Sequence, residues 1–295
     1  MTNLKLVGVI PPMVTPFDKD GEVDSGALVE LVSFLMNHVN GLFICGTYGS
    51  GPMMETYDRK KVVEIVTKTV KSKINVIVHI GATNTRTAIE LAKHAEAVGA
   101  THVSSVPPYY YSHNEEEVKL YFEEILKEVK IPVYVYNNPK TVGYAVSPDF
   151  VNKLADIGLS GVKDSSFDIM VLNDFMRKVK KENFDFVLGT EAMFLPASVL
   201  GIKAFIPGLA NVFPELLRDL YDACITARYD DARGLQNKIL YLRDSMHMVG
   251  SNIASVHAML KLRNINGGIP KRPYLSLDEG MVKKISDRLK AVGVI

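Results

Sequence analysis

The sequence predicts a (β/α)8 barrel of the α/β class, also called a TIM barrel, with a C-terminal helical extension. Eight short apolar runs recur along the chain, and amphipathic stretches with helical spacing lie between them. Within the runs the apolar residues are nearly continuous and do not alternate, which is typical of strands covered on both faces. The length of 295 residues suits one large barrel with a small appendage.

The expected strands share this apolar character and end at glycine or polar residues. They span residues 7–10, 41–46, 75–80, 101–106, 132–137, 159–164, 184–189 and 203–208. Between them, the spacing of leucine and valine predicts helices at 25–39 and 58–70. Asn84 and Ser147 are suited to cap two further helices. Three glutamates from Glu115 favour the start of another helix, because acidic side chains suit the positive end of the helix dipole.

After a helical pattern at 216–227 the strand signal stops. Three more helices are then predicted, at 229–248, 253–262 and 277–292. We therefore expect a barrel at 1–225 that carries the active site, and a helical extension at 226–295. An open doubly wound sheet is the competing fold, and eight strands without a dinucleotide-binding glycine fingerprint disfavour it.

The composition excludes several classes of protein. Lysine and arginine total 34 and aspartate and glutamate total 33, with no basic stripe, so nucleic acid is not an expected partner. No run approaches the roughly 18 apolar residues of a membrane span, and the first residues, MTNLKLVGVIPP, lack the pattern of a secretory signal. Cys45 and Cys224 fit no metal or redox spacing and indicate a reducing compartment, so a cytoplasmic protein is expected. The seven histidines show no metal-binding spacing, and no metal site is expected.

Catalytic groups of a barrel lie at the C-terminal ends of its strands, which turns the strand list into a short list of candidates. Lys163 follows the buried-looking pair Gly161-Val162, and a desolvated lysine at the barrel rim has a lowered pKa and acts as a nucleophile. On position alone, an ordinary lysine that faces solvent is the other interpretation. Tyr136 ends the preceding strand, and it is interpreted either as a proton shuttle or as a core aromatic residue.

Two loops at the same rim add further candidates. The glycine-rich loop from Gly46 to Gly51 lets backbone N–H groups approach an anion, so Thr47 and Tyr48 are candidates for holding a carboxylate. A lone glycine-rich loop is weak support for this interpretation. The run Tyr109-Tyr110-Tyr111 cannot be entirely core, so at least one of these rings should lie at a surface or interface.

Taken in order, these motifs resemble the dihydrodipicolinate synthase / N-acetylneuraminate lyase family of class I pyruvate aldolases, nearest to members like 2-keto-3-deoxygluconate aldolase. The similarity covers nearly the whole chain. It is carried by Pro12-Met13-Val14-Thr15-Pro16-Phe17, Gly46-Thr47-Tyr48-Gly49, Pro107-Pro108-Tyr109-Tyr110, Tyr136-Asn137-Asn138-Pro139 and Gly161-Val162-Lys163-Asp164.

The resemblance implies catalytic roles for four residues. Lys163 matches the Schiff-base lysine of the family, and Tyr136 matches its general acid/base. Thr47 matches a threonine that bonds this tyrosine and helps to hold the keto-acid carboxylate, beside Tyr48. Tyr110 matches a tyrosine that in several members reaches into the partner's site. No cofactor is expected, because the covalent imine forms on Lys163 itself.

The remaining implied contacts are to the substrates. Ile206 matches an apolar residue beside bound pyruvate, Gly189 lies at a backbone position near it, and Glu191 is placed to bind the second substrate. The partners implied are a small keto acid and an aldehyde, with no membrane. Members are commonly homotetramers built as dimers of dimers.

The sequence also differs from the family at positions whose residues bind the second substrate. Dihydrodipicolinate synthases usually carry an arginine where Thr141 stands, next to Lys140. Sialate lyases usually carry an acidic pair after the seventh strand, where this chain has Glu191 and Ala192. They also carry a serine after the eighth strand, where this chain has Gly208. Tyr48 replaces a second threonine.

We therefore expect a Schiff-base lyase that reversibly cleaves a 2-keto-3-deoxy sugar acid, or a similar keto acid, to pyruvate and an aldehyde. The alternatives are 4-hydroxy-tetrahydrodipicolinate synthase, or a dehydratase or hydratase-aldolase that uses the same imine. A non-catalytic protein that binds a metabolite is disfavoured, because binding alone does not need Lys163, Tyr136 and Thr47 together.

Overall fold

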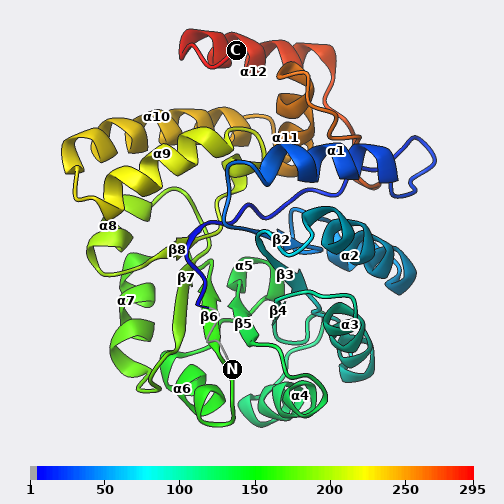
Figure 1. The fold of residues 1–295 in the computed structure, drawn as a ribbon, viewed down its shortest axis with the longest axis vertical. Coiled ribbons are helices and arrows are strands. Elements are labelled where there is room, and N and C mark those ends of the chain that lie inside the picture. Colours follow the sequence, from blue (N-terminus) through cyan, green and yellow to red (C-terminus); the bar gives the residue numbers. More distant parts are fainter. Residues whose placement is uncertain (1–4) are drawn as a thin grey trace.

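The computed structural model describes residues 5–295 as a nearly closed eight-stranded parallel barrel surrounded by helices (Figure 1). Residues 1–4, where the expected barrel unit begins, lie outside the described residues. The strands are β1 (Gly8–Val9), β2 (Gly41–Ile44), β3 (Asn75–His79), β4 (His102–Ser105), β5 (Val133–Asn137), β6 (Gly161–Asp164), β7 (Asp185–Leu188) and β8 (Ala204–Phe205). All eight lie within the predicted ranges, and the predicted fold is confirmed.

The strands follow one another around the sheet in the order β1-β8-β7-β6-β5-β4-β3-β2. The two end strands approach each other through a parallel bridge between Pro12 and Phe43. At the opposite end of the barrel, the Asp185 carboxylate accepts hydrogen bonds from the Tyr134 hydroxyl at 2.5 Å and the Leu6 amide at 2.9 Å. These bonds fasten the N-terminal segment across the barrel floor, so the open end lies at the C-terminal ends of the strands.

Helices begin where short polar side chains satisfy the free N–H groups of a first turn. Asn84 accepts from the Thr87 amide, Ser147 accepts from the Phe150 amide, and Asn114 forms a capping box with Glu117. The barrel helices are α1 (Ser25–Leu35), α2 (Thr56–Val70), α3 (Thr85–Ala97), α4 (Glu115–Glu128), α5 (Pro139–Val142), α6 (Pro148–Asp156), α7 (Ile169–Lys178), α8 (Phe194–Val199) and α9 (Pro214–Ile225). Short 3-10 turns are η1 (Gly51–Met53) and η2 (Gly208–Asn211).

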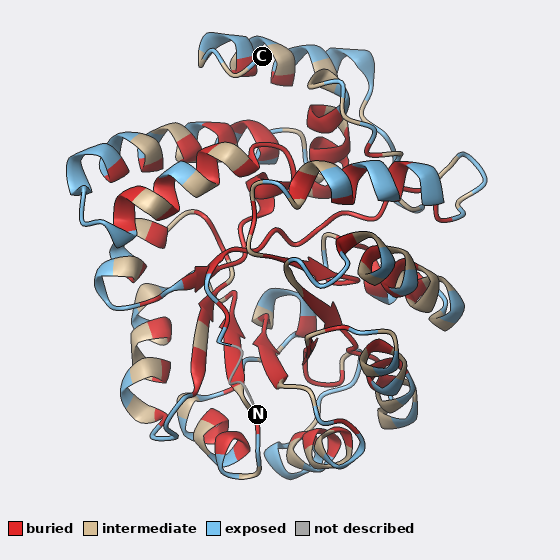
Figure 2. Ribbon diagram, viewed as in Figure 1, coloured by how far each residue is buried: buried red, intermediate tan, exposed pale blue. Residues whose placement is uncertain are grey.

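Burial separates two apolar layers. The strands are buried almost throughout, while the helices expose their outer faces (Figure 2). One layer joins the outer faces of the strands to the helices, and a smaller one fills the barrel interior. The interior layer includes Phe43, Tyr136 and Ile206, which later line or border the candidate site.

The C-terminal extension contains α10 (Tyr229–His247), α11 (Asn252–Leu262) and α12 (Glu279–Ala291), within about two residues of the predicted bounds. Helix α10 packs alongside α9, and α12 lies at the outer end of the molecule (Figure 1). After α11 the chain returns to the barrel, where Ile269 and Phe17 exchange backbone hydrogen bonds of 3.1 and 2.9 Å. The division at residue 226 stays a prediction. No helix within residues 5–295 is long and apolar enough to cross a membrane.

Candidate active site

Tyr136 and Lys163 are direct neighbours across two parallel strands. They are paired in the register of β5 and β6, so their side chains leave the sheet on the same side, toward the barrel interior. The Lys163 amine lies 3.7 Å from the centroid of the Tyr136 ring and 3.7 Å from that of Phe43. Both candidates therefore face one open space, and the interpretation of Lys163 as a solvent-facing lysine is wrong.

Burial controls the charge of Lys163. The residue is 3% exposed, and desolvation lowers the pKa of its amine well below the usual value of 10.5. The two ring faces attract an ammonium ion by about 0.5–2 kcal/mol, whereas removing a charge from water costs several kcal/mol. Desolvation is the larger effect, so burial favours the neutral, nucleophilic form of the amine.

Tyr136 is also buried, and hydrogen-bond donors surround its hydroxyl. Burial raises the pKa of the phenol, and side-chain hydrogen bonds with Thr47, Ser165 and Asn138 act in the opposite direction. The Asn138 amide donates to the Tyr136 oxygen at 3.0 Å. Donors that bond the phenolate make a buried tyrosine usable for moving a proton.

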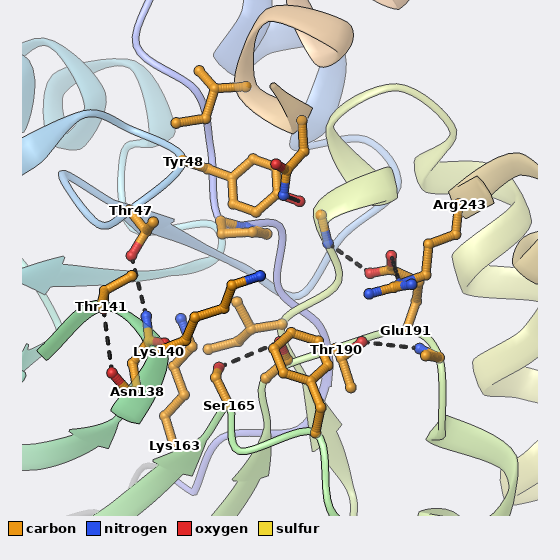
Figure 3. A pocket seen from close by; sticks show the side chains of 18 of the residues that line it. Thr47, Tyr48, Asn138, Lys140, Thr141, Lys163, Ser165, Thr190, Glu191 and Arg243 are labelled. Carbon is orange, nitrogen blue, oxygen red and sulfur yellow. Dashed lines mark hydrogen bonds and ion pairs between the residues drawn. The ribbon is translucent and has the colours of Figure 1, made fainter. Parts of the chain in front are cut away.

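Thr47 and Tyr48 lie in the loop after β2, opposite Lys163 (Figure 3). Tight packing fixes this loop: a Cβ on Gly51 would lie 1.7 Å from the Cys45 carbonyl oxygen, which leaves glycine as the residue that fits. Within residues 5–295 no acceptor is found for the backbone N–H of Thr47 or of Tyr48. N–H groups without a protein acceptor, in a loop that lines the same cavity as Lys163, are suited to the carboxylate of a keto acid.

The Tyr48 ring lies against Gly208 at the start of η2. Its hydroxyl accepts from the Asn252 side chain at 3.3 Å and donates to the Met246 sulfur at 3.9 Å. A Cβ at Gly208 would lie 2.5 Å from the Tyr48 oxygen and 2.7 Å from the adjacent ring carbon. The Tyr48 ring occupies the space that a larger residue at position 208 would need. The tyrosine at position 48 and the glycine at position 208 are therefore structurally coupled.

Replacing Gly208 by serine should lower the free energy of unfolding by about 1–3 kcal/mol, because the new side chain overlaps the Tyr48 ring. Adding Tyr48→Thr removes the ring, so the double variant should be more stable than the sum of the two single effects predicts. Denaturant unfolding of the four proteins measures this coupling. Strictly additive changes would show that the two residues do not interact.

Gly189 and Ile206 border the floor of the site at the ends of β7 and β8. A Cβ on Gly189 would lie 1.9 Å from the Ser165 hydroxyl oxygen and 2.6 Å from the Asp164 carbonyl oxygen, so this wall has no room for a side chain. Ile206 is 2% exposed and lines the cavity. Both residues are therefore placed beside the space in front of Lys163.

The side of the cavity formed by α10 and the loop after β7 is charged. Glu191 is 3% exposed, and one of its oxygens accepts from the Gly208 amide at 2.8 Å while the other lies 3.4 Å from Arg243 Nε. Burial raises the pKa of the Glu191 carboxyl, and the Arg243 guanidinium acts against this. Lys140 extends into the cavity from α5 (Figure 3). Burial, Arg243 and Lys140 together lower the pKa of His247.

These residues line a single cavity of ≈ 690 Å³. It contains seven of the eight predicted site residues, namely Thr47, Tyr48, Tyr136, Lys163, Gly189, Glu191 and Ile206. Tyr110 does not line it, because this ring is 85% exposed and packs edge-on against Tyr111 at 5.0 Å. Its backbone has a φ of 81°, a conformation that is strained for a bulky residue.

Several lining residues were not identified from the sequence. Asn138 follows Tyr136 by two positions, and strand alternation was a signal that could have placed both on one face. Arg243 and Asn252 come from the helical extension, well beyond the last strand, β8, and no local pattern connects them to the strand ends. Phe167 lines the cavity with a φ of 61°. Within residues 5–295 no group of three or more acidic, histidine or cysteine side chains is arranged to hold a metal ion.

Comparison with known proteins gives one consistent family. A model described as the dihydrodipicolinate synthetase family matches residues 5–292. The chain is 33% identical over 289 residues to the 4-hydroxy-tetrahydrodipicolinate synthase of Archaeoglobus fulgidus, which covers 98% of this chain and 99% of that protein.

Two solved structures extend the comparison. One is YagE, a prophage protein of E. coli K12 in complex with pyruvate, with a TM-score of 0.93 and 25% identity over 98% of this chain and 99% of that one. The other is KD(P)GA from T. tenax, with a TM-score of 0.90 and 26% identity over 97% of this chain and 99% of that one.

Proposed function

This chain belongs to the dihydrodipicolinate synthetase family, and from that premise we propose that it is a pyruvate-dependent class I aldolase. The observation that carries the proposal is the buried Lys163 amine beside Tyr136, where desolvation lowers the pKa of the amine. A lysine buried without an acidic partner has no structural purpose that an apolar residue would not serve better. Its position is explained if the amine forms a covalent bond.

In the proposed reaction, the Lys163 amine attacks the keto carbon of pyruvate, and water leaves to form an iminium ion. The iminium withdraws electrons, so the methyl group loses a proton to solvent water and becomes the nucleophilic carbon of an enamine. This carbon attacks an aldehyde, whose oxygen takes a proton from Tyr136. Water then hydrolyses the imine and releases the product. In the cleavage direction the same steps run backward, and Tyr136 accepts the proton.

In this proposal, the second substrate binds at the charged side of the cavity. We propose a 2-keto-3-deoxy sugar acid or a similar keto acid, because Glu191, Thr190 and Asn252 offer acceptors and donors suited to hydroxyl groups. The structural neighbour named KD(P)GA supports this class.

A second candidate is 4-hydroxy-tetrahydrodipicolinate synthase, with the semialdehyde of aspartate as acceptor. It is favoured by the Archaeoglobus relative of that name and by Lys140, a cation that extends into the cavity. Thr141 weighs against it, because threonine cannot form the paired bonds that an arginine makes with a carboxylate. A dehydratase or hydratase-aldolase would use the same imine.

The two candidates are separated by supplying pyruvate with either glyceraldehyde or aspartate semialdehyde. We expect a higher kcat/KM with glyceraldehyde, measured as pyruvate consumption with the products identified by mass spectrometry. Lys140→Met should weaken the reaction with the semialdehyde, which carries a carboxylate, more than the reaction with glyceraldehyde, which carries none. A higher kcat/KM with the semialdehyde would favour the synthase, and condensation with neither would contradict both.

We further propose a cytoplasmic homotetramer, built as a dimer of dimers, in which Tyr110 reaches the partner's site. The exposure and strained backbone of Tyr110 support a role for this ring at an interface, since strain of this kind usually serves a function. The resemblance of the Pro107-Pro108-Tyr109-Tyr110 turn to the family pattern supports the same assignment.

A further inference from the structure

Asn138 has a hydrogen-bonding position that the proposed reaction does not yet use. The residue is 6% exposed and lines the cavity at the end of β5. Its side-chain nitrogen lies 3.5 Å from the Thr47 hydroxyl oxygen (Figure 3) and 3.0 Å from the Tyr136 hydroxyl oxygen, so it bonds both hydroxyls.

The chemistry of an amide nitrogen sets the direction of these bonds. An amide NH2 has two hydrogens and cannot accept, so both hydroxyl oxygens must be the acceptors. Thr47 then keeps its own hydrogen for Tyr136, with which it also bonds. Tyr136 in turn donates to neither Asn138 nor Thr47. Its third side-chain partner, Ser165, also lines the cavity, so the Tyr136 hydrogen is kept on the cavity side.

We propose that Asn138 is a positioning residue of the aldol step, whose amide fixes the hydrogen-bond direction of Thr47 and Tyr136 so that the Tyr136 proton is kept for the substrate. The inference rests on the proposed function, since it assigns a role within proton transfer by Tyr136. Asn138 adds a hydrogen-bond donor to the proposed mechanism. This donor lies two positions after Tyr136, the tyrosine that it orients.

The backbone holds Asn138 in place for this role. Its carbonyl oxygen accepts from the amides of Thr141 and Val142 at 3.1 Å each, and the ring of Pro139 restricts the backbone of Asn138, the residue before it. A side chain on so rigid a turn loses little entropy when it donates a bond, so its donors are aligned before substrate arrives.

The hydrogen bond from Asn138 stabilises the phenolate form of Tyr136. Burial raises the pKa of Tyr136, which makes the phenolate scarce near neutral pH, and donation by Asn138 opposes this. A hydrogen bond to a charged group is stronger than one to a neutral group, so the Asn138 bond strengthens as Tyr136 gives up its proton. The amide therefore stabilises the charge that develops during transfer.

Two variants test the direction of the bonds. Asn138→Leu removes the donors, and Asn138→Asp keeps the size but replaces them with an acceptor that holds the Tyr136 proton. Turnover is followed in the cleavage direction across pH, with the aldol product of pyruvate and glyceraldehyde as the probe. Each protein is also treated with pyruvate and borohydride to measure the adduct on Lys163.

We expect both variants to form the adduct. The kcat of Asn138→Leu should fall by about 10- to 100-fold near neutral pH, and the pH midpoint at which kcat rises should move upward. Asn138→Asp should lose more activity than the leucine variant, because its carboxylate repels the phenolate. Met193→Leu, which changes another wall of the cavity without altering a hydrogen bond to Tyr136 or Asn138, should leave the midpoint in place.

Two results would overturn the role of Asn138: an aspartate variant as active as the unaltered protein, or a uniform loss in both variants with no shift of the midpoint. Failure of the proposed function would look different, since the unaltered protein would then form no adduct with pyruvate. A variant that loses activity and also loses the adduct would likewise contradict the role, because Asn138 is assigned to the step after the imine.

Discussion

Replacing Lys163 by methionine should abolish covalent capture of pyruvate and lower turnover by at least ~10³-fold. Methionine has a similar length but no amine, so the keto carbon has nothing to react with. Lys163→Arg is the matched control, because it restores a cation that cannot deprotonate and should be equally inactive. Activity in the arginine variant would show that charge, and not an attacking amine, is what residue 163 supplies.

The same methionine variant should be more stable than the unaltered protein at neutral pH. Burial lowers the folded pKa of Lys163 below its unfolded value, so folding is disfavoured more as the pH falls below about 10.4. Removing the amine removes this penalty, and the gain in Tm should shrink as the pH rises toward 10. Thermal unfolding at pH 7 and pH 10 measures the difference. A variant that is less stable at pH 7 would contradict the burial of an unpaired amine.

Tyr136→Phe should keep the pyruvate adduct and lower kcat by about 10²- to 10⁴-fold, the range expected when a general acid/base is removed. The ring that covers Lys163 remains, so the nucleophile stays desolvated, while the proton at the aldehyde oxygen has no donor. Adduct formation by mass spectrometry and turnover by pyruvate release are compared in the same preparation. Unchanged turnover would remove Tyr136 from proton transfer.

The fold could be predicted from the sequence because strand burial leaves a local signal. The run at 159–164 is bounded by glycine and reads as a strand, and the structure pairs Gly161–Asp164. Lengths were harder: the run at 203–208 forms only Ala204–Phe205, since the chain enters the η2 turn at Gly208. Barrel strands stop where loops begin to build the site, and apolar composition continues past that point.

The covalent half of the site could also be predicted, because Lys163 and Tyr136 lie at strand ends, where the barrel rule places catalytic groups. The second-substrate side could not. Arg243 reaches the cavity from α10, and only the packing of that helix against the barrel brings it near Glu191. Contacts of this kind depend on the position of a whole helix, which no local spacing encodes.

The Tyr48 departure shows why single positions are hard to interpret alone. In the sequence, Tyr48 was a bulky ring where a threonine is usual, and Gly208 was a separate change, the loss of a serine. In the structure the ring fills the space above Gly208 and bonds Asn252 of the extension. The extension therefore takes part in shaping the site, and substitutions in α11 should be judged by their effect on Tyr48.

Reduction of the protein with borohydride in the presence of pyruvate, followed by peptide mass spectrometry, tests the central claim most directly. The account predicts one added pyruvate-derived group per chain, located on Lys163 and absent from the Lys163→Met variant. An unmodified chain, or a group on any other lysine, would contradict it.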